Sequence, residues 1–179
     1  DVPATPTTVF PIASVTKLFT ATLAMMQVEA GRLDLDAPAA AYLDALPAAW
    51  GAVTARQMLS HTSGLPDLIV DPMAGTWLAE HYDAGIAAAA ALPPAFGPGA
   101  AGGYNPTDVL LLAAMVVRLA GRHLMLLLAE AIVEPLGLSA TAYGDARDVV
   151  PGRGPWYSRI DFSGPQPRLA ERIHPIWVA

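Results

Sequence analysis

The chain has 179 residues, of which 54% are hydrophobic and only 15% charged, so its composition excludes an intrinsically disordered protein. That length is typical of one domain with a substantial core. The net charge is −6, and this acidic balance disfavours a nucleic-acid partner, because phosphate binding requires a basic face.

Helices dominate the first half of the predicted structure. Residues 1 to 9 are rich in proline and threonine and predict a loop. A helix is predicted from 13 to 29, with Gly31 as its stop signal. Helical spacing predicts that one side of it carries Val15, Leu18, Phe19, Thr22, Leu23 and Met26. A short alanine-rich helix is predicted through Leu43. Thr54 and Gln57 form a capping-box pattern for another short helix, which a turn at 60 to 67 ends.

The second half begins with helices and then changes character. A helix is predicted at 76 to 91, and a proline- and glycine-rich loop at 93 to 103. Asn105 predicts an N-cap with Pro106 at the first helical position, for a helix from 106 to 120 that stops at Gly121. Another helix is predicted from 123 to 133. From 144 onward the repeated prolines predict a loop-rich tail, and almost no convincing strand is found.

Ser14 and Lys17 are the first candidates for chemistry. Lys17 is the chain's only lysine and follows Ser14 by three residues, so the two side chains share a helix face. A serine hydroxyl needs a base to become a nucleophile. A lysine amine can be that base when it is neutral, and burial favours the neutral form. Arginine cannot take this role, because it stays protonated. The spacing alone also fits a helix cap beside a solvated lysine.

Four segments, in order, resemble one family. The segment from Phe10 to Ala21 resembles the nucleophile segment of the serine β-lactamase and penicillin-binding-protein superfamily, in the branch of class C β-lactamases, D-alanyl-D-alanine carboxypeptidases and esterases. The other three segments are Gly31 to Asp36, Thr54 to Asp67 with its Ser60-His61-Thr62-Ser63-Gly64-Leu65-Pro66 loop, and Glu134 to Thr141. The match extends from residue 9 to about 145 and is highly specific in combination.

The resemblance implies an α+β, β-lactamase/DD-peptidase-like fold, in which a helical region lies beside an antiparallel sheet. This chain is then a partial domain over 1 to 179, mostly α-helical, with most of the sheet missing. It would comprise the nucleophile helix at about 13 to 30, a helical region at about 36 to 143 and a loop-rich tail at 144 to 179. The abrupt end at Trp177-Val178-Ala179 supports the same expectation of a fragment.

The family's second motif is Tyr-x-Asn, and the sequence here is Tyr104-Asn105-Pro106. The resemblance assigns Tyr104 a role in relaying protons between the nucleophile and the leaving group. Proline at 106 cannot supply the side-chain amide that contacts the substrate carbonyl. Asn105 is the candidate substitute for substrate binding, although a helix cap is the favoured interpretation for it. Substrate preference is therefore expected to differ from that of a standard β-lactamase.

The family's third motif, Lys or His followed by Thr or Ser and Gly on a strand, is absent. The similar His61-Thr62-Ser63-Gly64 matches a different family loop and is interpreted as structural, since residues two apart rarely form a nucleophile pair. The family also takes one oxyanion-hole donor from the missing strand, and losing such a donor typically costs about 10²–10³ in rate. The fragment alone is therefore expected to be inactive or nearly so.

The predicted function is that of a serine hydrolase forming an acyl-enzyme on a β-lactam, a D-Ala-D-Ala peptide or a small ester. The catalytic residues would be Ser14, Lys17 and Tyr104. The alternative is a non-catalytic relative with a binding or regulatory role. No cofactor and no metal are predicted, because His81, His123 and His174 lack ligand spacing and cysteine is absent. We expect a monomer. No membrane span is expected, since the longest apolar runs are too short. The sequence does not determine the cellular compartment.

Overall fold

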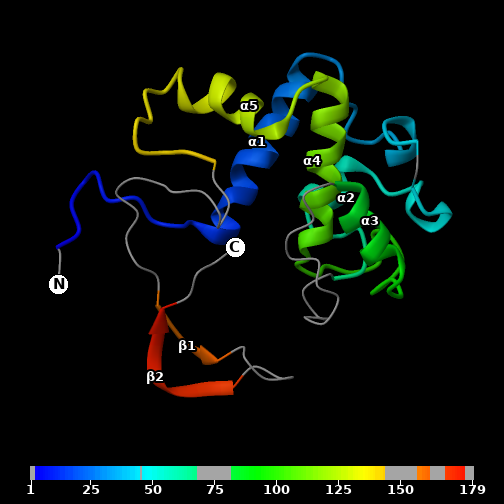
Figure 1. Ribbon diagram of the computed structural model, residues 1–179. Coiled ribbons are helices and arrows are strands. Elements are labelled where there is room, and N and C mark those ends of the chain that lie inside the picture. Colours follow the sequence, from blue (N-terminus) through cyan, green and yellow to red (C-terminus); the bar gives the residue numbers. More distant parts are fainter. Residues whose placement is uncertain (1–2, 45, 68–81, 144–156, 162–167, 176–179) are drawn as a thin grey trace.

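The computed structural model describes residues 3–44, 46–67, 82–143, 157–161 and 168–175 (Figure 1). Its longer helices are α1 (Thr16–Glu29), α3 (Tyr82–Ala90) and α4 (Pro106–Ala120), and its short ones are α2 (Ala55–Leu59) and α5 (Leu124–Leu128). Single 3₁₀ turns occur at η1 (Ala13–Val15), η2 (Ala39–Ala41) and η3 (Ala48–Trp50), and a π turn, η5, at Ala129–Val133. Two strands, β1 (Tyr157–Asp161) and β2 (Arg168–Pro175), complete the described elements.

Helix α4 is the centre of the helical region. It packs against α1, α2, α3 and α5, and Figure 1 shows α1 flanked by α5 and α4. Three of these helices, α1, α2 and α4, contribute almost fully buried apolar side chains, among them Leu23, Met58, Leu111, Leu112, Met115 and Val116. Burying each such side chain is worth about 1.5–3 kcal/mol, so this core fixes α1 and α4 relative to each other.

The helix caps predicted at Thr54 and Asn105 and the helix stop predicted at Gly121 are confirmed, whereas the alanine-rich helix predicted through Leu43 is only the 3₁₀ turn η2. The Thr54 hydroxyl accepts from the Gln57 N–H at 3.3 Å, while the Gln57 side chain accepts from the Thr54 N–H at 3.0 Å, which completes the capping box. Asn105 caps α4 with Pro106 in its first turn, and Gly121 ends it in the left-handed conformation at φ 64°. Of the helix predicted at 76 to 91, the part from Tyr82 to Ala90 is helical, and 76 to 81 lie outside the described residues.

The apolar stripe predicted on the first helix is only partly buried. The buried residues of α1 are Thr20, Leu23, Ala24 and Gln27. In contrast Leu18 is 67% exposed and Val15, in the preceding turn, 54%. The predicted stripe therefore spans two faces of α1, and within the described residues only one of them has a packing partner.

Within the tail that was predicted to be loop-rich, at 144 to 179, two segments form strands. Strands β1 and β2 pair antiparallel, with Tyr157 opposite Pro175 and Asp161 opposite Arg168, and with a register irregularity between Ser158 and Ile160. The frequent prolines of this tail favoured a loop prediction. Each strand is also short, so its own sequence gives only a weak strand signal, and pairing with the other strand contributes to its stability. Pro175 itself lies at the end of β2, where a missing N–H is tolerated.

Among the described helices, none is by itself long and apolar enough to cross a membrane. Only α4 together with α5 and η5 reaches that length and composition, and this pair is bent by 81°. The helices of this pair contribute Leu111, Leu112, Leu124 and Leu128 to the buried core.

Candidate active site

Ser14 lies in the 3₁₀ turn η1, directly before α1, and Lys17 lies in the first turn of α1. Side chains three residues apart eclipse one another in a 3₁₀ turn, and this brings the Lys17 Nζ to 2.9 Å from the Ser14 Oγ. Ser14 is exposed, whereas Lys17 is half-buried. The hydroxyl is therefore open to a ligand while its partner amine is partly shielded.

Tyr104 approaches the same oxygen from a distant part of the chain. It precedes the N-cap of α4, and its hydroxyl donates a hydrogen bond to the Ser14 Oγ at 2.8 Å. The Lys17 Nζ lies 5.1 Å from the centre of the Tyr104 ring, within the range of a cation–π contact. The three residues predicted as catalytic from the sequence thus converge on one oxygen atom.

The electrostatics of Tyr104 favour its ionised form. Burial acts to raise the pKa of Tyr104, but hydrogen bonds with Lys17 and Ser14 and the Lys17 charge outweigh it, so the pKa lies below the ordinary value of 10.0. A phenol of lowered pKa gives up its proton more readily. The Tyr104 oxygen can therefore act as a proton donor or acceptor at Ser14.

Asn105 serves as the cap of α4. Its Oδ1 accepts from the Asp108 N–H at 3.1 Å, and its Nδ2 donates to the Leu65 carbonyl at 2.9 Å. The residue is only 4% exposed. Both ends of the amide are engaged within the protein, so a contact with a substrate would require breaking one of these bonds.

The segment that leads to Tyr104 is tied to the 61–64 loop by backbone hydrogen bonds. The N–H groups of Ala95, Gly99 and Gly103 donate to carbonyls of that loop at 3.0, 2.7 and 2.8 Å. Gly64 has φ +72°, and a Cβ there would lie 2.0 Å from the Phe96 carbonyl oxygen. Only glycine allows this close approach.

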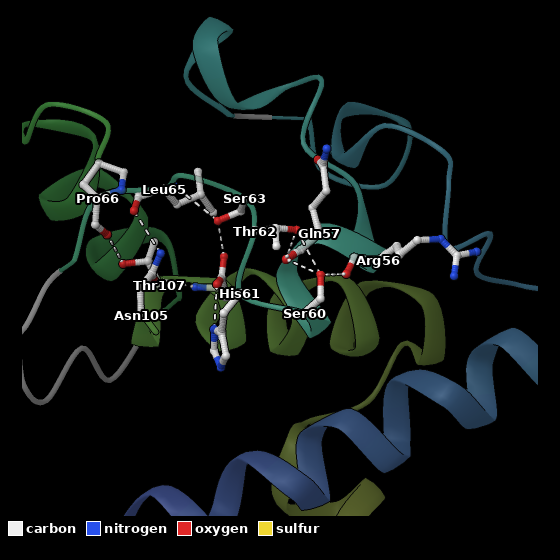
Figure 2. Close-up of polar contacts among 11 residues, drawn as sticks. Arg56, Gln57, Ser60, His61, Thr62, Ser63, Leu65, Pro66, Asn105 and Thr107 are labelled. Carbon is white, nitrogen blue, oxygen red and sulfur yellow. Dashed lines mark hydrogen bonds and ion pairs between the residues drawn. The ribbon is translucent and has the colours of Figure 1, made fainter. Parts of the chain in front are cut away.

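A buried carboxylate, Asp108, organises the 61–64 loop. Its Oδ2 is 2.8 Å from the His61 Nδ1, and its Oδ1 accepts a hydrogen bond from Ser63. Figure 2 shows Asn105 and Thr107 reaching the two residues that follow this loop: Asn105 donates to the Leu65 carbonyl, and Thr107 donates to the Pro66 carbonyl at 2.6 Å. Burial raises the pKa of Asp108, against the opposing hydrogen bonds from Ser63 and His61.

This cluster agrees with the structural interpretation of the His61-Thr62-Ser63-Gly64 segment. The Ser63 hydroxyl is buried and donates to Asp108 rather than to His61, so the two do not form a nucleophile and base. Sequence reasoning missed Asp108. The available signal was an acidic residue three positions after the cap, which also occurs at ordinary helix starts.

Among the described residues, no group of three or more histidine and carboxylate side chains is arranged to hold a metal ion. The site instead offers a hydroxyl, an amine and a phenol in mutual contact. Such a set can transfer protons and form a covalent bond to a carbonyl.

Comparison with known proteins places this geometry in a family. The β-lactamase family model matches residues 1–171. The chain belongs to the β-lactamase family. Its fold is accordingly the β-lactamase and penicillin-binding-protein fold, as the sequence motifs predicted.

Three solved structures illustrate the relationship. A D-stereospecific amidohydrolase from Streptomyces sp. is 30% identical with a TM-score of 0.76, over 93% of this chain and 52% of its own. A penicillin-binding protein from Bacillus halodurans is 27% identical with a TM-score of 0.76, over 94% and 53%. A D-amino acid amidase from Ochrobactrum anthropi SV3, solved with L-phenylalanine amide, is 26% identical with a TM-score of 0.76, over 88% and 46%. The chain therefore spans about half the length of these structures.

Proposed function

We propose that the protein containing this chain is a serine hydrolase that cleaves amide bonds through an acyl-enzyme. The observation that carries the proposal is the pair of contacts at the Ser14 Oγ, 2.9 Å from the Lys17 Nζ and 2.8 Å from the Tyr104 hydroxyl. A nucleophile with a base and a proton relay within hydrogen-bond reach is the arrangement that covalent catalysis requires.

The steps follow from these positions. The Ser14 oxygen attacks the carbonyl carbon of the substrate, and its proton passes to the neutral amine of Lys17. Tyr104 passes a proton to the leaving nitrogen as the carbon–nitrogen bond breaks. Lys17 then returns its proton to Tyr104, so both groups regain their starting forms. Water attacks the carbonyl carbon of the ester on Ser14, one water proton passes through Lys17 or Tyr104 to the Ser14 oxygen as the ester bond breaks, and the carboxylic acid is released.

Amides of D-amino acids are the substrate class that we propose first. Two of the similar structures are named as a D-stereospecific amidohydrolase and a D-amino acid amidase. The absence of a side-chain amide at Pro106 also favours a substrate other than a standard β-lactam. β-Lactams, D-Ala-D-Ala peptides and small esters complete the substrate panel.

The experiment is covalent labelling of the complete gene product with a fluorophosphonate and a fluorescent penicillin, followed by peptide mass mapping. We expect an adduct on Ser14 and none after Ser14→Ala. Lys17→Arg is the matched control for charge, because arginine keeps the positive charge but cannot accept a proton. Labelling of Lys17→Arg at the wild-type rate would refute the role of Lys17 as base.

A non-catalytic binding or regulatory protein is the second candidate. It is favoured by one observation, the proline at 106 in place of the amide-bearing residue of the family motif. Absence of any adduct on Ser14 in the folded complete protein, together with saturable binding of a D-amino acid amide, would establish this alternative.

A further inference from the structure

His61 touches Tyr104 through both its backbone and its side chain. Its carbonyl accepts from the N–H of Gly103, the residue before Tyr104, at 2.8 Å. Its imidazole lies against the Tyr104 ring, with the ring centres 4.9 Å apart and the planes tilted by 53°. This separation lies in the range in which aromatic rings pack favourably against one another.

His61 is itself held in place from behind. The Nδ1–Asp108 contact of 2.8 Å fixes the plane of the imidazole, and Asp108 is fully buried at the N-terminal turn of α4. When Asp108 is ionised, the Nδ1 of His61 carries the hydrogen and donates a hydrogen bond to the carboxylate. His61 also has φ +55°, an unfavourable conformation for a non-glycine residue that the surrounding contacts must maintain.

Tyr104 needs such support because little else restrains it. Tyr104 is 55% exposed, and its described contacts are the His61 ring and, from the segment around α1, Ser14 and Lys17, while the Asp67 charge also acts on its phenol. A free phenol can rotate away from Ser14, and a misplacement of about 1 Å in a reacting group costs roughly 10²-fold in rate.

We propose that His61 is a positioning residue whose ring, oriented by Asp108, holds the Tyr104 hydroxyl on the Ser14 oxygen. The proposal rests on the proposed function for its effect on rate, but the placement of Tyr104 does not depend on turnover. His61 exchanges no proton with the substrate and forms no bond to it. The charged or titratable groups around the Tyr104 phenol are Lys17, His61 and Asp67, with Asp108 behind the imidazole.

Two substitutions separate the functions of the imidazole. His61→Phe keeps an aromatic face for Tyr104 and removes the donor to Asp108. His61→Asn keeps a donor for Asp108 and removes the ring. His123→Asn is the matched control, since His123 is an exposed cap of α5 whose Nδ1 accepts from Met125, and asparagine caps equally well.

Both readouts use the complete gene product, because this chain spans about half of its relatives. The first is the ionisation midpoint of Tyr104, followed by ¹³Cζ-tyrosine NMR and assigned with Tyr104→Phe. The second is the rate of Ser14 labelling by a fluorophosphonate, with kcat and KM for an amide substrate. We expect His61→Asn to move the midpoint toward that of free tyrosine and to lower labelling and kcat about 10²-fold with little change in KM. We expect His61→Phe to keep labelling within about tenfold of wild type.

The outcomes separate this proposal from the proposed function. A wild-type midpoint and rate in His61→Asn would overturn the positioning role. Equal loss of rate in His61→Asn and His61→Phe, with the Tyr104 midpoint unmoved in both, would overturn it in favour of direct proton transfer by His61. Absence of Ser14 labelling in the wild type would refute the proposed function alone, and a moved Tyr104 midpoint in His61→Asn would still support the positioning role.

Discussion

Gly64→Ala gives the sharpest test of how the segment before Tyr104 is held. A Cβ at Gly64 would lie 2.0 Å from the Phe96 carbonyl oxygen and 2.8 Å from its carbonyl carbon. Normal non-bonded separations are about 3.5 Å or more, so the backbone must move by more than about 1 Å. That movement would strain the Ala95–Gly64 hydrogen bond of 3.0 Å. Overpacking of this kind costs about 1–3 kcal/mol, in addition to the conformational penalty of φ +72°.

Gly31→Ala isolates the conformational penalty. Gly31 has φ +68°, nearly that of Gly64, but a Cβ there meets nothing within 4 Å. We expect Gly31→Ala to cost about 1 kcal/mol and Gly64→Ala about 2 kcal/mol more. Urea denaturation followed by circular dichroism measures both, with one shared slope. If the two variants lose the same stability within about 0.5 kcal/mol, the close packing of Gly64 on Phe96 is refuted.

The remaining predictions concern a cap and two titrating groups. Thr54→Ala should lower the free energy of unfolding by about 1 kcal/mol in urea, while Thr54→Ser should retain it; equal losses would contradict the capping box. Asp108 has a pKa raised above 3.8, so its contribution is present below that pH and is lost as pH rises through the raised pKa. Wild-type stability should therefore fall relative to Asp108→Asn above about pH 4 in parallel denaturation series, and a constant difference would rule this out. Lys17→Ala should raise the pKa of Tyr104 in an ultraviolet titration, because it removes a hydrogen bond and a charge that lower it; an unchanged midpoint would exclude that cause.

Local chemistry made part of the structure predictable from sequence. The caps at Thr54 and Asn105 depend on one side chain and a backbone N–H three residues away, so the sequence contains the whole interaction. The Ser14–Lys17 contact is equally local. The placement of Tyr104 was predicted through family motifs, because its contact with Ser14 joins residues far apart in the chain.

What was missed depends on distant partners. Asp108 meets His61 and Ser63 across the fold, and no spacing in the sequence indicates that contact. The same holds for β1 and β2, whose pairing joins two short segments of the tail. On α1 the apolar pattern was real, but a pattern of apolar residues does not reveal which face a partner covers.

At position 106, the residue that favours a helix start differs from the amide-bearing residue of the family motif. Asn105 is held in place by two hydrogen bonds as the cap of α4, and proline is a favoured residue in the turn that follows. This arrangement stabilises the helix that carries Asp108, and through Asp108 the imidazole of His61 beside Tyr104. The side-chain amide of the family motif is absent for the same reason, because the residue that would bear it is the proline that begins α4. The capped start of α4, with Asp108 behind His61, and the loss of the side-chain amide expected from the family motif are thus two consequences of one local sequence.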